Sequence, residues 1–247
     1  MPHDEYREPF MGGGSIFFAK PKASVNWIND LEIDIIKTYR VIADPQLRQE
    51  LIAKFSKEVA SKERHSEIKQ MKITSLLDLA FKTYYLNRTS YSGIINKPSW
   101  GYKDGKSSPP ENWANFIDQA GKKLEGVNIT SLDFEQVITA PSVSKKVLMY
   151  LDPPYYHADQ KRAYTKSFSF EDHQRLAASL KNTTHLFCLS YDNCEEIRLL
   201  YKWAEINEVS WLYNTANLNG IPRKLGKEII ITNYQVNNTI MEQICLL

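Results

Sequence analysis

Residues 147–156, "VLMYLDPPYY", end an apolar run with an aspartate, two prolines and two tyrosines. The apolar run is typical of a buried strand. Pro153 and Pro154 fix the backbone and lack N–H donors, which leaves the Asp152 carboxylate and the Pro153 carbonyl as acceptors directed at one point. Tyr155 adds a flat aromatic face beside them. The same letters also suit a plain turn followed by a tyrosine at the rim of the fold.

Two acceptors beside a stacking ring would receive an aromatic amine, such as the exocyclic NH₂ group of a nucleobase. That nitrogen is a poor nucleophile because its lone pair is delocalised into the ring. Hydrogen bonds from both of its N–H groups to fixed acceptors favour the pyramidal, more nucleophilic form and stabilise the positive charge that develops during attack. A base inside a duplex cannot reach such a site, so the turn predicts a base that is flipped out of the stack.

A glycine cluster lies in "EPFMGGGSIFF", residues 8–18, between a short strand and an apolar helical turn. Glycines after a strand let the backbone approach a ligand closely, and the helix start behind them offers unpaired N–H groups. The dinucleotide fingerprint is absent because its third glycine would fall at Phe17, and no Gly-Lys-Ser/Thr follows for a P-loop. Alone, the cluster indicates a tight turn as readily as a nucleotide-type site.

Acidic residues follow two further strands. Asp30 ends "ASVNWIND", where a ribose hydroxyl pair would lie if the glycine loop held the rest of an adenosine-containing cofactor. Asp133 and Phe134 follow the strand within "VNITSLDFEQVI" and could supply an acceptor and an apolar wall for adenine. Both aspartates could equally cap the helices that follow them, with Phe134 as a hydrophobic staple.

The elements that must position these residues alternate between strand and helix. Strand, glycine loop, helix, strand and helix follow in order, which predicts a parallel sheet with crossover helices. In "LEIDIIKTYRVI" a helical face is expected at Leu31, Ile35, Ile36 and Tyr39. Further strands are predicted at "VLMYL", "HLFCLSY", "AEINEVSWLY" and "GKEIIITNY", and the last two should pair antiparallel because only a loop separates them.

Residues 38–127 differ from the rest of the chain in charge and composition. They hold 15 basic and 10 acidic side chains, against 16 and 19 in the remainder, and contain charged helical sequence and a loop rich in Gly, Ser, Pro, Lys and aromatic residues. We expect an inserted, mostly helical domain at 38–127 in a catalytic domain formed by 1–37 and 128–247. The basic excess suits a polyanion-binding insert, although an ordinary solvated face has the same composition.

Composition excludes several other classes. The chain lacks both an apolar run of about 18 residues and a basic start followed by an apolar stretch, so neither a membrane span nor a secretory signal is predicted. Cys188, Cys194 and Cys245 have no paired spacing with histidine and read as core and tail residues of a cytoplasmic protein, rather than metal ligands or disulfide partners.

The ordered set "EPFMGGGSIFF", "NDLEIDIIKTY", "FKTYYLNRTSYSGI", "LDFEQVI", "YLDPPYY" and "KEIIITNY" resembles the Dam-type (D12 class) N6-adenine DNA methyltransferases, from Tyr6 to Tyr234. The resemblance implies a Rossmann-like, seven-stranded, mostly parallel α/β sheet with an inserted target-recognition domain, and no metal. It implies S-adenosylmethionine as cofactor, held by Phe10, Gly12, Gly14, Asp30, Asp133 and Phe134. It also implies that the target adenine is bound by Asp152, Pro153, Pro154 and Tyr155.

The resemblance implies double-stranded DNA as the partner, contacted by the insert through Asn87, Arg88, Tyr91, Lys97, Lys103 and Lys106. Arg or Lys can read guanine, Asn can read adenine, and a tyrosine can wedge into the vacated stack. Tyr91 could instead pack under a loop, and Asn87 and Arg88 could cap a helix. We further expect a monomer, with a cognate restriction endonuclease as a candidate second partner.

In the family a segment with a W-x-G-G-K motif usually precedes the first strand, and here Met1 lies only a few residues before "YREPF". We therefore expect a cofactor site that lacks one wall. Two other functions stay open: a catalytically silent DNA-binding relative, and an enzyme that methylates cytosine N4 or adenine in RNA. The products of incubation with S-adenosylmethionine distinguish them.

Overall fold

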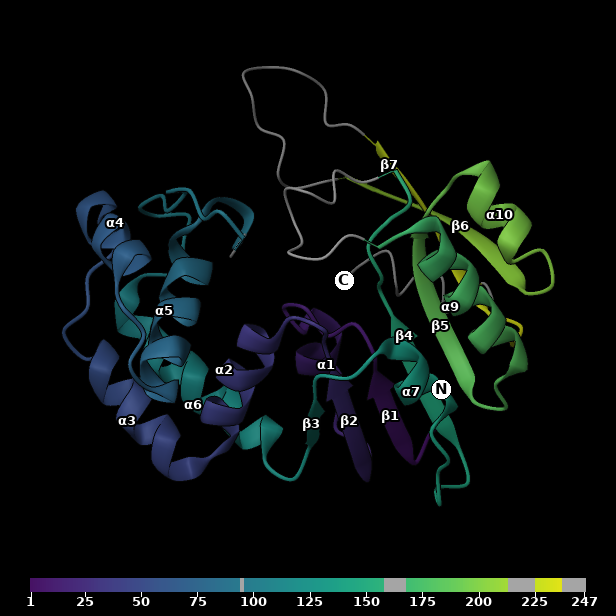
Figure 1. Ribbon diagram of the computed structural model, residues 1–247, viewed down its shortest axis with the longest axis horizontal. Coiled ribbons are helices and arrows are strands. Elements are labelled where there is room, and N and C mark those ends of the chain that lie inside the picture. Colours follow the sequence, from purple (N-terminus) through teal and green to yellow (C-terminus); the bar gives the residue numbers. More distant parts are fainter. Residues whose placement is uncertain (94–95, 158–167, 213–224, 237–247) are drawn as a thin grey trace.

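The computed structural model describes residues 1–93, 96–157, 168–212 and 225–236 (Figure 1). Within these ranges a seven-stranded sheet has the order β3-β2-β1-β4-β5-β7-β6. The strands are β1 (Glu5–Glu8), β2 (Val25–Asn29), β3 (Asn128–Thr130), β4 (Val147–Leu151), β5 (Leu186–Asp192), β6 (Glu205–Leu212) and β7 (Leu225–Thr232). The predicted Rossmann-like α/β fold with a mostly parallel sheet is confirmed.

The pairing of the strands explains where a ligand site can form. β1 pairs in parallel with both β2 and β4, so the chain runs from β1 to one side through β2 and β3 and later to the other side through β4 and β5. β7 pairs antiparallel with β6, as predicted, and also with β5, which places it between them. Ligands of open α/β sheets bind at the carboxyl ends of strands where the order reverses, which here means between β1 and β4.

The central strand β1 is buried although its sequence, EYRE, is mostly charged. Arg7 Nε donates to Glu5 Oε1 at 2.6 Å, and the Arg7 guanidinium also donates to the carbonyls of Val137, Ala140 and Pro141. A buried charge is tolerated only when it is paired and hydrogen-bonded. The two residues therefore tie the middle of the sheet to the end of α7 (Phe134–Thr139) and to the residues just after it.

Helices α2 to α6 form most of the predicted insert, at the β3 side of the sheet (Figure 1). They are α2 (Ile33–Ala43), α3 (Pro45–Phe55), α4 (Lys62–Gln70), α5 (Leu76–Thr89) and α6 (Trp113–Leu124), with the 3-10 turns η1 (Tyr91–Gly93) and η2 (Pro110–Asn112) between the last two. One buried cluster joins Ile28 of β2 to Leu51, Phe81 and Trp113. The insert is thus packed against the sheet through a shared core, and α2 crosses the proposed boundary at Thr38 without interruption.

The other half of the sheet is covered by α7, α9 (Phe170–Asn182) and α10 (Glu195–Leu200), while α1 (Ser15–Ala19) connects β1 to β2. α9 begins with a capping box in which Ser169 and Asp172 bond reciprocally. A second buried cluster includes Met149, Leu176, Leu189 and Ile231. Among the helices that the structure describes, none is both long and apolar enough to span a membrane.

Candidate active site

A cavity of about 300 Å³ opens at the carboxyl ends of β1, β2, β3 and β4. Its lining includes all six predicted cofactor residues together with two residues of the Asp-Pro-Pro-Tyr turn: Phe10, Gly12, Gly14, Asp30, Asp133, Phe134, Asp152 and Pro154. Pro153 and Tyr155 belong to the same turn, but the described lining does not include them. The volume lies at the lower end of the range for small-molecule sites.

The glycine loop needs its glycines for two backbone reasons. Gly12 and Gly14 have φ values of +46° and +70°, in the left-handed region that side chains disfavour. A Cβ atom at Gly14 would also lie 2.2 Å from Met11 Cε and 2.9 Å from Phe18 Cε2. The Tyr39 hydroxyl donates to the Gly12 carbonyl at 2.9 Å, which holds the loop from α2. The loop is therefore a fixed, closely packed wall of the cavity.

Asp30 connects this loop to the next helix. Its carboxylate accepts the Gly12 amide at 2.7 Å through one oxygen and the Glu32 amide at 2.8 Å through the other. Burial raises the pKa of Asp30 above its usual value, and the two amide hydrogen bonds oppose that rise. Each carboxylate oxygen has a further lone pair, so these two backbone contacts and a ligand contact are compatible.

Leu31 shows one difference from the predicted helical face. α2 begins at Ile33, so Leu31 precedes the helix, is exposed over 46% of its surface and lines the cavity. Ile36 does lie on the buried face of α2. The apolar periodicity continued into the turn that ends β2, and this is why the sequence pattern placed the helix start too early.

Asp133 and Phe134 form the wall at the end of β3. Asp133 caps α7 in a capping box with Gln136, as the alternative interpretation required, and its Oδ1 also accepts from Arg175 Nη2 at 2.8 Å. The Phe134 ring stacks on Phe10 with a centroid distance of 5.5 Å. Phe168 and Arg175 also contact the Phe134 ring, at 5.6 Å and 4.9 Å from its centroid. Sequence reasoning missed these last two residues, which come from a distant part of the chain.

Asp152 follows the last residue of β4 and points into the cavity. By surface area Asp152 is an exposed residue. Many protein atoms nevertheless lie around its carboxyl group and reduce the hydration of the charge. Burial, followed by the charge of Glu228, raises the pKa of Asp152 to about 6, and a hydrogen bond from Tyr155 partly opposes this. The carboxyl group thus changes charge near neutral pH, unlike an ordinary aspartate.

Glu8 is a second buried acid in the lining that the sequence did not single out. The Tyr6 hydroxyl donates to Glu8 Oε2 at 2.6 Å. Burial raises the pKa of Glu8 to about 8, and the charge of Asp152 acts in the same direction. The carboxyl end of β1 therefore carries an acid whose charged form is disfavoured by its surroundings.

Tyr155 is anchored from behind by residues of two other strands. Its hydroxyl lies 2.8 Å from Ser190 Oγ on β5 and donates to Glu228 Oε2 on β7 at 2.9 Å. Nothing in the sequence indicated this contact, because the three residues are widely separated and buried polar residues on strands have no pattern of their own. It links the turn after β4 to the antiparallel part of the sheet.

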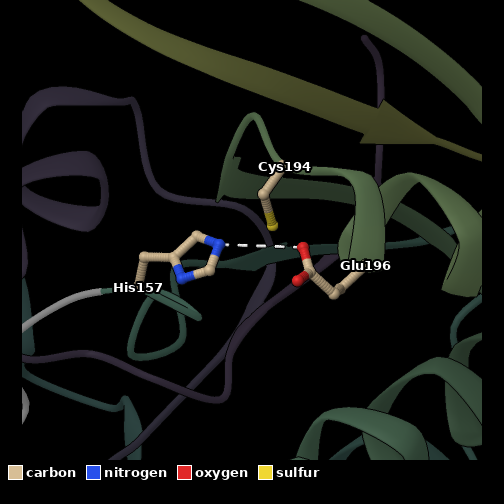
Figure 2. Close-up of side chains that lie close together, drawn as sticks. All are labelled: His157, Cys194 and Glu196. Atoms are coloured by element: carbon tan, nitrogen blue, oxygen red, sulfur yellow. Dashed lines mark ion pairs between the residues drawn. The ribbon is translucent and has the colours of Figure 1, made fainter.

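The end of the same turn is held by the loop that follows β5. The amides of Tyr156 and His157 each donate to the Asp192 carboxylate at 3.0 Å. Next to this contact lie three side chains with possible metal-ligating atoms, all within 4.8 Å of one another: His157, Cys194 and Glu196 (Figure 2). His157 Nε2 is 3.7 Å from Glu196 Oε2, and burial raises the pKa of the Cys194 thiol to about 11. Sequence spacing did not bring these residues together.

The predicted DNA-contacting residues lie on α5 and on the loop between α5 and α6. Asn87 Nδ2 donates to the Gly93 carbonyl at 3.0 Å, and the half-buried Arg88 guanidinium lies over the rings of Tyr84 and Phe116 at 5.2 Å and 5.3 Å. Tyr91 is 45% exposed. Lys97, Lys103 and Lys106 are exposed, and Lys97 has a left-handed φ of 52° that is unusual outside glycine.

A family model described as D12 class N6 adenine-specific DNA methyltransferase matches residues 1–215. The type II methyltransferase M1.LlaDCHI from Lactococcus lactis subsp. cremoris is 28% identical to the chain over 259 aligned positions, which cover 94% of this chain and 87% of that protein. The type II methyltransferase M.CviBI from Paramecium bursaria Chlorella virus NC1A is 26% identical over 242 positions, covering 94% of this chain and 88% of that protein.

Proposed function

Because the chain belongs to the family of D12 class N6 adenine-specific DNA methyltransferases, we propose that it transfers the methyl group of S-adenosylmethionine to N6 of adenine in DNA. The observation that carries the proposal is Asp152, whose carboxylate enters the cavity beside the glycine loop at the point where the strand order reverses. A fixed acceptor at that point is what an amine nucleophile requires.

The proposed cofactor fits the lining of the cavity. The glycine loop provides a wall where Gly14 leaves no room for a side chain, and Asp30 has lone pairs left for a ribose. The rings of Phe10 and Phe134, which stack on each other, together with Asp133 offer an apolar wall and one acceptor for adenine. Glu8 and Asp152 place two acids toward the cationic end of the ligand. S-adenosylmethionine supplies an electrophilic methyl group on a positively charged sulfur.

The turn after β4 would act on the target base. The Asp152 carboxylate and the Pro153 carbonyl accept the two N–H groups of the exocyclic amine, and Pro154 holds the backbone between them and Tyr155. Positioning and electrostatic stabilisation of the developing charge then lower the barrier to direct displacement. Asp152 can take the amine proton afterwards, since its pKa of about 6 makes it a better base than an ordinary aspartate.

The insert, residues 38–127, would hold the DNA while the remainder, 1–37 and 128–247, forms the catalytic domain. Lys97, Lys103 and Lys106 are exposed and would contact phosphates, and the exposed Tyr91 would fill the gap left by the flipped base. Arg88 and Asn87 are already engaged by aromatic rings and by the Gly93 carbonyl, so their contribution would be to shape this surface. The relatives' description as type II methyltransferases supports a restriction endonuclease as a functional companion.

The test is incubation with labelled S-adenosylmethionine and unmethylated DNA, followed by nucleoside analysis. The expected product is N6-methyladenine; N4-methylcytosine, or methylated RNA in a parallel reaction, would assign the other amine acceptors, and no product would point to a silent DNA-binding protein. Asp152→Ala is expected to lower the transfer rate by at least about a hundredfold, because it removes the acceptor of the developing charge. Its DNA affinity serves as a control and should match that of the natural chain, and its unfolding temperature should be no lower.

A further inference from the structure

The hydroxyl of Tyr155 connects the turn after β4 to strands β5 and β7. It is bonded to Ser190 on β5 and to Glu228 on β7, whose side chains belong to residues that are only 3% and 5% exposed. A phenol has one proton, which is shared between two carboxylates: Glu228 Oε2, at 2.9 Å, and Asp152, whose pKa a hydrogen bond from Tyr155 lowers. Ser190 therefore donates its own proton to the tyrosine oxygen.

We propose that Glu228 and Ser190 are positioning residues for methyl transfer, which hold the Tyr155 ring in place next to Asp152 and act on the reaction through the tyrosine hydroxyl. The inference rests on the proposed function and extends it to the antiparallel edge of the sheet.

The anchoring restricts the rotation of the side chain about χ1, because the hydroxyl oxygen is held by two other strands. The oxygen lies on the χ2 axis, so the plane of the ring is restrained by packing instead. The Tyr191 ring, 6.0 Å away between centroids at an angle of 37°, supports Tyr155 from the sheet side. Tyr191 is itself fully buried, and its hydroxyl bonds to His173 of α9. A base that stacks on Tyr155 would therefore meet a surface that is already ordered, which reduces the entropy lost on binding.

The same contact acts on the charge of Asp152. The titratable groups that face Asp152 are Glu8 from β1, Tyr150 from β4, Tyr155 from its own turn and Glu228 from β7. Glu228 raises the pKa of Asp152 by charge repulsion, while Tyr155 lowers it by a hydrogen bond. Removal of the Glu228 charge and removal of the Tyr155 hydroxyl should consequently move the titration of Asp152 in opposite directions.

The experiment measures kcat/KM for DNA against pH, which reports groups of the free enzyme. The variants are Glu228→Gln, Tyr155→Phe, their double variant and, as matched control, Glu205→Gln on the exposed side of β6. In the natural chain kcat/KM should fall at low pH as Asp152 becomes protonated. We expect the midpoint of this fall to move to lower pH in Glu228→Gln and to higher pH in Tyr155→Phe. At the plateau Tyr155→Phe should be slower on the order of tenfold, as for the loss of a hydrogen bond to a charged group. The double variant should be no slower than Tyr155→Phe, and Glu205→Gln should behave as the natural chain.

Suppose the natural chain methylates adenine but the pH at which kcat/KM falls is unchanged in the variants. That result would overturn the inference, and so would a plateau loss in the double variant equal to the product of the two single losses. Absence of transfer by the natural chain would instead remove the proposed function, and the inference with it. If Glu228→Gln does not fold, Ser190→Ala replaces it, with a loss of about threefold expected for one neutral hydrogen bond and none expected on top of Tyr155→Phe. An additional loss there would count against the inference.

Discussion

At the scale of single residues, the stability of the fold and the role proposed for Asp152 place opposite requirements on its carboxyl group. Burial and the nearby Glu228 disfavour its charged form, yet only that form accepts both the hydrogen bond and the proton of an amine. The folded-state pKa of about 6 lies above the usual value of 3.8. Protonation of Asp152 therefore stabilises the fold at low pH, and that stabilisation is lost as the pH rises toward 6.

This conflict leads to a prediction for the natural chain. Methyl transfer should fall as the pH drops through about 6, where Asp152 becomes protonated. Asp152→Asn should abolish most of the activity, and the remaining activity should no longer fall at this pH. It should also raise the unfolding temperature at neutral pH, because an uncharged amide replaces a disfavoured carboxylate. A pH-rate profile and thermal unfolding at several pH values check the two halves. An unfolding temperature that does not rise would contradict the assigned environment of Asp152.

Sequence reasoning reached the residues that stand in contiguous motifs. The glycines and Asp152 were predictable because a turn at the end of a strand leaves local marks, namely positive φ and proline. Glu8, Arg175, Ser190 and Glu228 were not, because their roles depend on which strands and helices become neighbours. Asp133 shows both limits, because it forms the cap of the alternative interpretation and also lines the cavity. Asp30 lines the cavity too, but the N-cap of α2 is Glu32, so Asp30 does not cap that helix.

At the scale of elements, the central strand β1 depends on a buried ion pair. Arg7 is 1% exposed and bonds to Glu5, to the Val137 carbonyl in α7 and to two carbonyls just after that helix. Although burial opposes ionisation, hydrogen bonds from Ser142 and Arg7 hold the pKa of Glu5 below its usual value. A strand pattern alone could not have revealed this, since EYRE reads as polar and exposed.

Arg7→Ala should therefore destabilise the fold by about 3–5 kcal/mol, because it leaves the Glu5 carboxylate buried without its partner. Denaturant unfolding followed by circular dichroism measures the loss. Arg198→Ala is the matched control: Arg198 pairs with the exposed Glu208 at the surface, where about 1 kcal/mol or less is expected. Equal losses in the two variants would show that β1 does not rely on the Arg7 contacts.

The order of elements was largely predictable and the arrangement of the sheet only in part. Alternating periodicity marked the parallel strands and their crossover helices, and the short connection marked the antiparallel pair β6 and β7. The position of β7 between β5 and β6 does not follow from periodicity, because both a central and an edge position bury an apolar strand. The charged helical stretch after Asp44 divides into α3 and α4, since the segment from Ser56 to Ser61 ends one helix and caps the next.

At the scale of the whole molecule, charge is separated between the insert and the rest of the chain. The insert carries a net charge of +5 within a total of +2. Its exposed lysines follow α5, and the remainder carries the acidic lining of the cavity. Such a distribution would favour binding of a polyanion to the insert while only a single base reaches the acidic cavity.

Replacement of Lys97, Lys103 and Lys106 by alanine should weaken DNA binding at all sequences alike. It should also reduce the slope of log affinity against log salt by about 0.9 for each phosphate that the variant no longer neutralises. Fluorescence anisotropy at several salt concentrations measures both effects. The control replaces Lys145, Lys146 and Lys181, which are exposed near the amino ends of β4 and β5, away from the cavity. A slope reduced equally by both triple variants would disprove a specific role for the loop.

The place of β7 also bears on biosynthesis. β5 and β6 leave the ribosome before the strand that joins them, because β7 comes last among the described strands. Until then the edge of β5 presents unpaired backbone groups, which invite pairing with another nascent chain. Glu228 arrives on that late strand and is the partner of Tyr155. Translation would therefore complete the edge of the sheet and the support of the turn after β4 in a single event, so that a chain without β7 would lack the bond that holds Tyr155.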